Sequence, residues 1–193
     1  MDDMHKVIES KADLNEWVKY EKARYGYHHG FIGRWFPISE TDLLVKHQIR
    51  LRRTEYYENT GHKMLAIISK IMLNRIQNKY SLHVPINTCG RGLQIMHVGP
   101  VLINWHASIG EDAIIHINTA IVSNSSDGTA PSIGHNLFLS VGANIVGNII
   151  LGNYCVIGAG AVVNKGFEQD DITLAGIPAK VISEKGCAGW GRV

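Results

Sequence analysis

The stretch VGANIVGNIILGNYCVIGAGAVVNK, residues 141–165, decides the fold of this chain. An aliphatic residue recurs in it at every sixth position, at Ile145, Leu151, Ile157 and Val163. An α-helix with about 3.6 residues per turn cannot keep such positions on one face. A flat strand alternates its faces every two residues and leaves the recurring glycines unexplained. A coil of short strands joined by tight corners accounts for both features.

The same six-residue step extends upstream of this stretch as far as Ile103. It gives eleven positions between Ile103 and Val163, and ten of them are aliphatic. We therefore predict a three-sided parallel β-helix, in which three units close a turn of about 18 residues and the aliphatic side chains stack inward. Its two ends need covers, because each coil is buried only by its neighbours.

One position of the repeat is polar. Asp127 occupies it, within the segment SNSSDGTAPS at 123–132. A polar, glycine-containing segment at this point predicts a loop that leaves the prism and returns in phase at Ile133.

A second irregularity lies at the upstream end of the repeat. Cys89, Ile95 and Val101 also step by six, but they are two residues out of phase with Ile103. In this upstream phase His97 points outward, and we expect that orientation because an aliphatic interior is a poor environment for an imidazole.

The first 80 residues differ in composition from the rest of the chain. They hold 14 of the 19 Lys and Arg residues but four of the 20 glycines. Apolar residues at helical spacing predict helices over about 9–25, 40–59 and 62–78. We expect a helical domain at 1–80, the β-helix at 81–182 and a C-terminal tail at 183–193.

Two side-chain patterns in the helical part allow alternative interpretations. The third helix carries an apolar stripe made of Leu65, Ile68, Met72 and Ile76. Such a stripe predicts a core or a subunit contact. The basic cluster Arg50, Arg52 and Arg53 favours a solvated helix face over a phosphate site, because the formal net charge of the chain is only +2.

Composition excludes several functional classes. A net charge of +2 does not favour nucleic acid or an anionic membrane, and no apolar run approaches the roughly 20 residues of a membrane span. The start MDDMHKVIES lacks the apolar core of a secretory signal. The three cysteines show neither disulfide-framework spacing nor a CxxC pair. These observations predict a cytoplasmic protein with no nucleic-acid or membrane partner.

Several segments make the chain resemble the hexapeptide-repeat acyltransferases, and among them the serine acetyltransferase branch. They are VPINTCGRGLQIMHVGPVLIN (84–104), the stretch at 141–165, AGIPAKVI (175–182) and the helical segment LVKHQIRLRRTEYYENTGHKMLAIISKIMLNRIQNKYSLHVP. The resemblance covers about residues 40–182. It implies a mainly β fold, a left-handed parallel β-helix with an N-terminal α-helical domain. It also implies transfer of an acetyl group from acetyl-CoA to an acceptor hydroxyl.

The resemblance places the general base on His97. A histidine titrates near neutral pH, so it can take the proton of an attacking hydroxyl and return it to the leaving thiolate. Because the acceptor attacks the thioester directly, neither a covalent enzyme intermediate nor a metal ion is expected.

Some residues depart from the serine acetyltransferase pattern. Met96 stands where the family has an aspartate, Ala130 where it has a second histidine, and Thr129 where it has an arginine. The acid that orients the base falls near Leu82 and His83, neither of which is acidic. The groups that would hold a zwitterionic amino acid are therefore largely missing.

These departures favour an acceptor hydroxyl on a sugar of a capsular or exported polysaccharide. A sugar needs a base and a hydrogen-bonding cleft rather than a clamp of charges. Serine O-acetylation in cysteine biosynthesis and a catalytically inactive β-helix scaffold stay open as alternatives. We expect the acceptor to contact His83, Met96 and His116.

The resemblance also implies where CoA and a second chain bind. The expected contacts with the CoA arm are Ser140, Val141, Gly142, Ala159 and Gly160. Lys165 and Lys180 are the cations expected near its phosphates. In this family the site lies between the prisms of a homotrimer, and pairing of two trimers through the helical domain is a further alternative.

The spacing of three histidines raises a competing interpretation. His97, His116 and His135 are each 19 residues apart, which is nearly one coil, so a three-histidine zinc site is conceivable. Their different phases in the repeat argue that they diverge, and we expect no metal.

Overall fold

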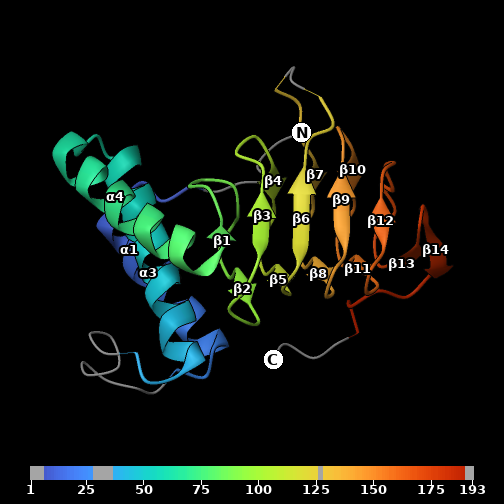
Figure 1. Ribbon diagram of the computed structural model, residues 1–193, viewed down its shortest axis with the longest axis horizontal. Coiled ribbons are helices and arrows are strands. Elements are labelled where there is room, and N and C mark those ends of the chain that lie inside the picture. Colours follow the sequence, from blue (N-terminus) through green and yellow to red (C-terminus); the bar gives the residue numbers. More distant parts are fainter. Residues whose placement is uncertain (1–6, 28–36, 126–127, 190–193) are drawn as a thin grey trace.

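A computed structural model describes residues 7–27, 37–125 and 128–189 of the chain (Figure 1). Helices α1 (Lys11–Arg24), α3 (Glu40–Asn59) and α4 (Lys63–Tyr80) come first, close to the ranges predicted from the sequence. Short strands follow and wind into a three-sided parallel β-helix. No helix in the described part of the chain is long and apolar enough to cross a membrane.

Three sheets form the sides of the prism, here called faces A, B and C. Face A consists of β1 (Leu82–His83), β3 (Val101–Ile103), β6 (Thr119–Val122), β9 (Asn144–Val146) and β12 (Val162–Val163). Face B consists of β4 (Ser108–Ile109), β7 (Ser132–Ile133) and β10 (Ile150–Leu151). Face C consists of β2 (Gln94–Ile95), β5 (Ile114–Ile115), β8 (Phe138–Leu139), β11 (Val156–Ile157), β13 (Thr173–Gly176) and β14 (Ala179–Ser183). The chain visits the faces in the order C, A, B, so the same three edges recur in every coil.

The repeat read from the sequence forms the core. Its ten aliphatic residues are all buried: Ile103, Ile109, Ile115, Ile121, Ile133, Leu139, Ile145, Leu151, Ile157 and Val163. Ile103 pairs with Ile121, 18 positions on, whereas Ile121 pairs with Ile145, 24 positions on. The additional six residues belong to the expected loop before Ile133; its polar residue Asp127 lies outside the described residues.

The phase shift upstream of Ile103 lengthens one corner of the prism. Ile95 pairs with Ile115 and Ile103 pairs with Ile121. Ile95 and Ile103 are therefore eight positions apart in the sequence, whereas the equivalent residues of the next coil, Ile115 and Ile121, are six positions apart. The two additional residues lie at the edge between faces C and A, in the segment that contains His97.

Both ends of the β-helix are covered, as the solenoid geometry requires. At the N-terminal end, Leu44, Leu51 and Leu73 of the helices belong to the same buried cluster as the prism interior. At the C-terminal end, β13 turns back through the antiparallel strand β14.

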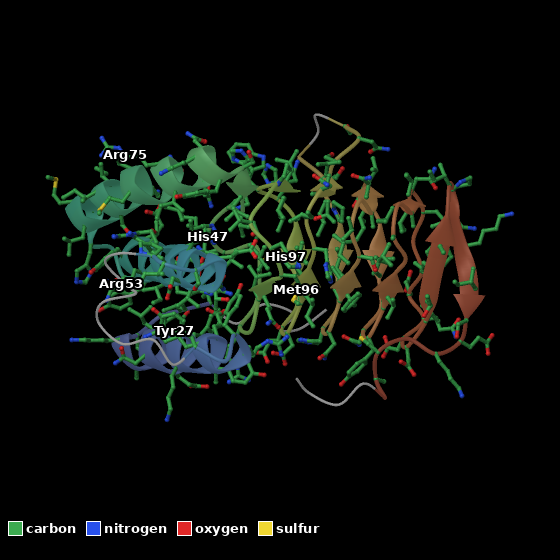
Figure 2. All side chains as sticks on the ribbon, turned by 60° about the horizontal axis from the view of Figure 1, so that its bottom comes forward. Tyr27, His47, Arg53, Arg75, Met96 and His97 are labelled. Atoms are coloured by element: carbon green, nitrogen blue, oxygen red, sulfur yellow. The ribbon has the colours of Figure 1, made fainter. Side chains whose placement is uncertain are left out.

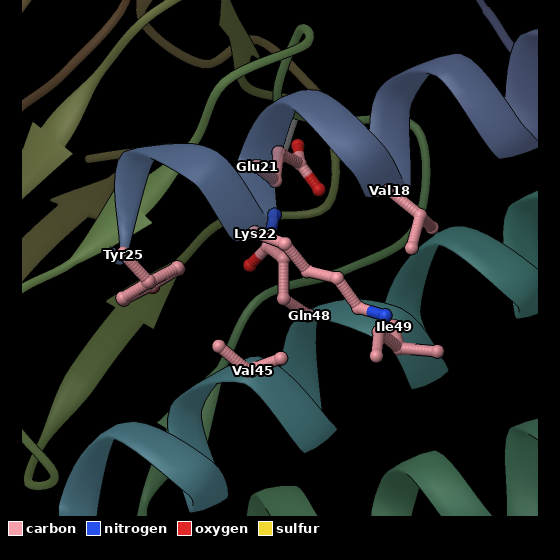
Figure 3. A pocket seen from close by; sticks show the side chains of 7 residues that line it. All are labelled: Val18, Glu21, Lys22, Tyr25, Val45, Gln48 and Ile49. Atoms are coloured by element: carbon pink, nitrogen blue, oxygen red, sulfur yellow. The ribbon is translucent and has the colours of Figure 1, made fainter. Parts of the chain in front are cut away.

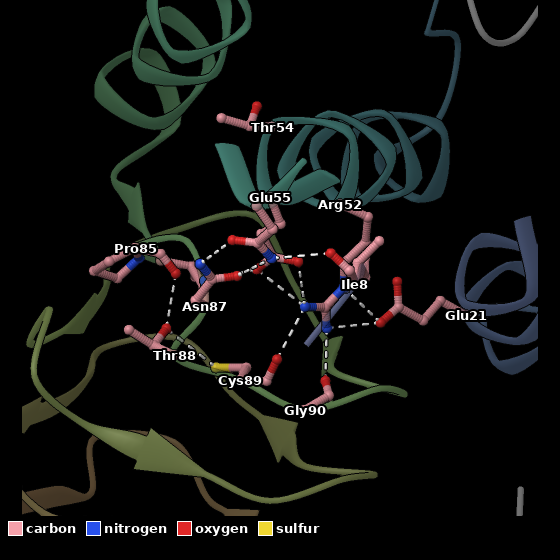
Figure 4. Close-up of polar contacts among 12 residues, drawn as sticks. Ile8, Glu21, Arg52, Thr54, Glu55, Pro85, Asn87, Thr88, Cys89 and Gly90 are labelled. Atoms are coloured by element: carbon pink, nitrogen blue, oxygen red, sulfur yellow. Dashed lines mark hydrogen bonds and ion pairs between the residues drawn. The ribbon is translucent and has the colours of Figure 1, made fainter. Parts of the chain in front are cut away.

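Arg52 joins the helices to the first coil, and its position corrects the prediction of a solvated basic cluster. Its side chain is completely buried. It pairs with Glu21 at 2.8 Å and with Glu55 at 2.9 Å, and donates to the carbonyls of Cys89 and Gly90 (Figure 4). Burial alone would lower the pKa of Arg52, but the two carboxylates raise it above its usual value, so the guanidinium stays charged.

The apolar stripe predicted for α4 is not part of the core. The buried side of α4 consists of Ala66, Ser69, Leu73 and Gln77. Leu65, Ile68 and Met72 are instead 46%, 51% and 40% exposed. The small side chains of Ala66 and Ser69 allow this side to come close to α3, where the hydroxyl oxygens of Ser69 and Thr54 lie 2.7 Å apart. The core interpretation of the stripe is therefore wrong, and a subunit contact stays a prediction.

Candidate active site

His97 lies on the lengthened corner after β2, and its side chain is 55% exposed. The outward orientation expected from the repeat is thus confirmed. Figure 2 shows His97 and Met96 at the junction between the helical layer and the β-helix. An imidazole in this position is open to reactants that approach along the edge between faces C and A, here called the C–A edge.

Glu40 supplies the acid that the sequence did not reveal. Its Oε2 lies 3.3 Å from Nδ1 of His97, and its Oε1 accepts the backbone N–H of Val98 at 2.6 Å. The hydrogen bond from Val98, and then the bond and charge of His97, lower the pKa of Glu40. A carboxylate that stays ionised favours the tautomer with the proton on Nδ1, which leaves Nε2 free to accept a proton.

The start of α3 fixes the position of Glu40. Ser39 and Asp42 form a capping box, in which each side chain bonds the backbone of the other. This cap makes Glu40 the first residue of the helix, at the side of the prism. The sequence indicated a helix start at this point, but it contained no signal that Glu40 would meet a corner 57 residues further on. The family position for such an acid falls near Leu82 and His83, neither of which is acidic.

The end of α1 holds β2 directly before the site. The backbone N–H of Ile95 donates to the hydroxyl of Tyr25 at 2.8 Å, and that hydroxyl donates to the carbonyl of Ile95 at 3.2 Å. The side-chain amide of Gln94 donates to the carbonyl of Arg24. Two helices therefore position the corner, one from each side of His97.

His116 lies next to His97, at the following turn of the C–A edge. Its ring centroid is 6.4 Å from that of His97 and 5.3 Å from that of Phe138. Burial, and then the charge of His97, lower the pKa of His116, which favours its neutral form. Of the three residues expected to contact the acceptor, Met96 and His116 lie beside His97, whereas His83 lies on β1 of face A.

The residues expected to contact the CoA arm continue along the same edge. They lie in the two corners that follow β8 and β11: Ser140, Val141, Gly142, Ala159 and Gly160. The corners stack directly, since Gly142 N–H donates to Ile117 and Gly160 N–H to Val141. A Cβ built on Gly160 would meet no atom within 4 Å, so the edge is open there. Small side chains and open space fit a long, narrow ligand.

The two lysines expected near the phosphates lie in different places. Lys165 follows β12 at the edge between faces A and B, with its Nζ 5.2 Å from the ring of Phe167. Lys180 lies on β14, where it is exposed and pairs with Ala175. The structure therefore brings Lys180, but not Lys165, near the end of the C–A edge.

The three histidines with the spacing of one coil do not converge. His135 lies at the edge between faces B and C, where its Nδ1 accepts the backbone N–H of Glu111 at 3.0 Å. Within the described residues, no group of three His, Cys, Asp or Glu side chains is arranged to hold a metal ion.

A separate pocket lies between α1 and α3 (Figure 3). Its lining consists of Val18, Glu21, Lys22, Tyr25, Val45, Gln48 and Ile49. It is a narrow gap between packed helices whose lining does not include His97, and we do not assign it to the site.

No protein-family model matches the chain. A serine acetyltransferase of Buchnera aphidicola is 32% identical over 137 residues, which is 69% of this chain and 48% of that protein. The enzyme of Salmonella typhimurium is 28% identical over 131 residues, which is 66% of this chain and 46% of that protein. The chain thus spans about half the length of the curated relatives it matches.

Solved structures agree with this similarity. The serine acetyltransferase of Brucella abortus superposes with a TM-score of 0.69 at 20% identity, covering 92% of this chain and 72% of that chain. The Neisseria gonorrhoeae enzyme gives a TM-score of 0.67 at 22% identity, covering 90% of this chain and 68% of that chain. The fold is therefore the left-handed parallel β-helix of the hexapeptide-repeat proteins, with an N-terminal helical part, as predicted. Within this class the chain is serine acetyltransferase-like.

Proposed function

We propose that the chain is an acetyl-CoA-dependent O-acetyltransferase with His97 as its general base. The observation that carries the proposal is an exposed imidazole, held by the carboxylate of Glu40, at the head of an open edge of the β-helix. The names of the relatives support it, and two similar structures are named as serine acetyltransferase complexes with CoA or coenzyme A.

The geometry suggests how the proton moves. Nε2 of His97 takes the proton of the acceptor hydroxyl while the oxygen bonds to the acetyl carbon. Glu40 stabilises the imidazolium that forms, since its Oε2 faces Nδ1. The imidazolium then gives its proton to the departing thiolate, so the products are an ester and free CoA. General-base catalysis of this kind contributes about 10²–10⁴ to the rate.

Serine is the acceptor that the comparisons favour. The curated relatives are named serine acetyltransferase, and one similar structure of that name is a complex with serine. They support the alternative of serine O-acetylation better than the polysaccharide sugar favoured by the residue pattern. The side chains available to contact serine beside the base are His116 and Met96.

A sugar hydroxyl is the second candidate, and a specific observation favours it. Met96 is next to the base, half-buried, and brings no charge to that side of the site. Thr129 and Ala130, near the end of the loop, stand in place of the family's arginine and histidine. A neutral acceptor is compatible with this lining, whereas an amino acid needs partners for two opposite charges.

The proposal is tested by thioester consumption in the presence of serine and, separately, of several nucleotide sugars. Turnover is expected with one acceptor class and should fall at least about 100-fold in His97→Ala. His106→Ala is the matched control, because His106 is also exposed but lies at the edge between faces A and B. A His97→Ala variant within a factor of about three of the unmodified protein would refute the base assignment.

Calorimetry with acetyl-CoA distinguishes an enzyme from an inactive scaffold. Binding is expected, and Ala159→Trp should weaken it because the bulky ring fills the C–A edge. Ala12→Trp, at an exposed position of α1, should leave the affinity unchanged. An absence of binding by the unmodified protein favours the scaffold interpretation.

We also propose that the site is completed in a homotrimer. His97, Ala159 and Gly160 are exposed in one chain, which leaves room for a neighbouring prism. Sedimentation equilibrium measures the assembly directly. A mass of three chains supports this proposal, a mass of six supports pairing of trimers, and a single chain contradicts both.

A further inference from the structure

The outward side of α4 is an unusual surface for a helix of this length. Six large apolar side chains on it are 40–72% exposed: Met64, Leu65, Ile67, Ile68, Ile71 and Met72. They lie opposite the buried side of the helix, at successive turns. In Figure 2 the three helices form a layer with α4 at its outer margin, so this side faces away from the rest of the chain. Contiguous exposed apolar side chains indicate a surface that binds something.

The charges of α4 all have one sign. Its sequence KMLAIISKIMLNRIQNKY contains Lys63, Lys70, Arg75 and Lys79 and no acidic residue. Lys70 pairs with Glu58 of α3 at 2.8 Å. The other three have no carboxylate partner within the described residues, although Lys79 lies over the ring of Tyr80. An apolar helix surface with unpaired cations beside it suits an anionic, partly apolar partner.

A cavity beside the helix strengthens this pattern. It has a volume of about 220 Å³ and lies between α3 and the C-terminal half of α4. Its lining consists of Pro37, Leu43, Lys46, Arg75, Ile76, Lys79 and Tyr80. Three of these residues are cationic and none is acidic, while the others are apolar or aromatic. Cations that converge over an apolar floor are suited to a phosphate group attached to a hydrocarbon.

We propose that this surface docks on an anionic phospholipid membrane. The six exposed apolar residues of α4 enter the boundary of the acyl chains, and Lys46, Arg75 and Lys79 hold a lipid phosphate. The net charge of +2 concealed this arrangement, because the cations of α4 are balanced by acids elsewhere in the chain. The proposal is independent of the acetyltransferase chemistry.

Charge decides between a membrane and a second copy of the chain. In a symmetric contact through this surface, the cations of one α4 would face those of the other without an acidic residue on either helix. Like charges placed across an interface oppose association. An anionic lipid surface attracts the same cations and also accommodates the apolar side chains.

The test is co-sedimentation of the full chain with vesicles. Vesicles of phosphatidylcholine with phosphatidylglycerol are compared with vesicles of phosphatidylcholine alone, at low and at raised salt. We expect binding to the anionic vesicles that is about tenfold or more tighter than to the neutral ones and that weakens with salt. Equal binding to both kinds of vesicle, or binding to neither, would overturn the proposal.

Two double variants locate the surface. Arg75→Gln with Lys79→Gln should weaken vesicle binding about tenfold or more, and Ile68→Gln with Ile71→Gln should weaken it by a similar factor. Lys19→Gln on α1 and Ile182→Gln on β14 are exposed controls that should change it by less than about twofold. All these side chains are exposed, so the variants are expected to fold.

Two further measurements separate the competing ligands. Calorimetry with inorganic pyrophosphate reports whether the cavity binds a soluble phosphate; such binding without vesicle binding would replace the membrane by a free ligand. Sedimentation equilibrium of the Ile68→Gln and Ile71→Gln double variant reports self-association. A lower mass with unchanged vesicle binding would make the surface a contact between copies and refute the membrane docking.

Discussion

The proposed base, His97, and the carboxylate that holds it come from two distant parts of the chain. His97 is on a corner of the β-helix, and Glu40 is the first residue of a helix 57 positions earlier. The sequence predicts the role of His97 because this residue lies in the segment at 84–104 that resembles the acyltransferases and because its position in the repeat points outward. The sequence does not predict its partner, because a contact between a helix start and a corner depends on how two folded parts dock. Sequence periodicity describes each part by itself and contains no information on that docking.

Glu40→Gln tests the role of the charge. The amide oxygen can still accept the N–H of Val98, so the corner keeps its position while the negative charge is lost. We expect kcat to fall about tenfold or more, because the imidazolium formed in the reaction loses its counter-charge. Because the pKa of Glu40 is lowered, the unmodified protein should keep this benefit until the pH falls below the usual glutamate range. A kcat-versus-pH profile of both proteins measures the effect.

Glu40→Asp and Glu40→Ala complete the test. The aspartate keeps the charge but shortens the reach, and the alanine loses both the charge and the bond to Val98. The expected order of kcat is glutamate, aspartate, glutamine, alanine. Equal activity of the glutamine and glutamate proteins across the pH range would show that Glu40 only supports the backbone.

At the scale of elements, Arg52 makes the contact between α3 and the first coil depend on a buried charge. Arg52→Met removes the partner of Glu21 and Glu55 and leaves the carbonyls of Cys89 and Gly90 without their donor. Breaking a buried ion pair by removing one partner costs about 3–5 kcal/mol. Urea denaturation should show a loss of this size in the free energy of unfolding.

The matched control for Arg52 is Lys19→Met. Lys19 is exposed on α1, so its replacement should change the free energy of unfolding by less than about 0.5 kcal/mol. A loss below about 1 kcal/mol in Arg52→Met would mean that the buried network contributes little.

His47 gives α3 a dependence on pH. It is completely buried, and burial, followed by the charge of Arg52, lowers its pKa to about 4. In the unfolded chain a histidine has a pKa of about 6.5. Between about pH 6.5 and pH 4 the unfolded chain therefore binds a proton at His47 that the folded chain does not bind. Stability from this group is therefore full above about pH 6.5 and falls by about 1.4 kcal/mol per pH unit down to pH 4. His47→Leu should flatten that slope in urea denaturation at pH 7.5 and pH 5, and His62→Leu, at an exposed position, should not.

The helices also show which property of an element the sequence reveals. Their ranges were predicted within a few residues, because propensity, caps and breaks act locally. The sequence did not predict which side of α4 packs against α3. The buried side carries the small residues Ala66 and Ser69, which allow a close approach to α3, and the larger residues of the apolar stripe lie outside this contact. Hydrophobic spacing identifies the apolar side of a helix, but the neighbouring element decides which side is covered.

At the scale of the whole molecule, the six-residue repeat determined most of the β-helix in advance. The six-residue period predicts which residues point inward, how long each coil is and where the chain returns after the loop. It can do so because each coil repeats the geometry of its neighbour. The period does not predict which elements cover the two ends of the β-helix. There the repeat stops, and packing depends on individual side chains.

The repeat makes a clear distinction between positions. Ile115 is buried in the stack of face C, whereas Ile150, next to an inward position, is 38% exposed. Ile115→Ala should reduce the free energy of unfolding by about 2–5 kcal/mol through the cavity it leaves. Ile150→Ala should change it by less than about 0.5 kcal/mol. Comparable losses for both in thermal or urea denaturation would contradict the inward assignment of the repeat.

The long corner at His97 has a consequence for anyone who would redesign this scaffold. A consensus version, regularised to strict hexads throughout, would remove the two residues that carry the reactive ring away from the column. Such a protein should be stable but inactive in the proposed reaction, because His97 lies where the repeat is interrupted.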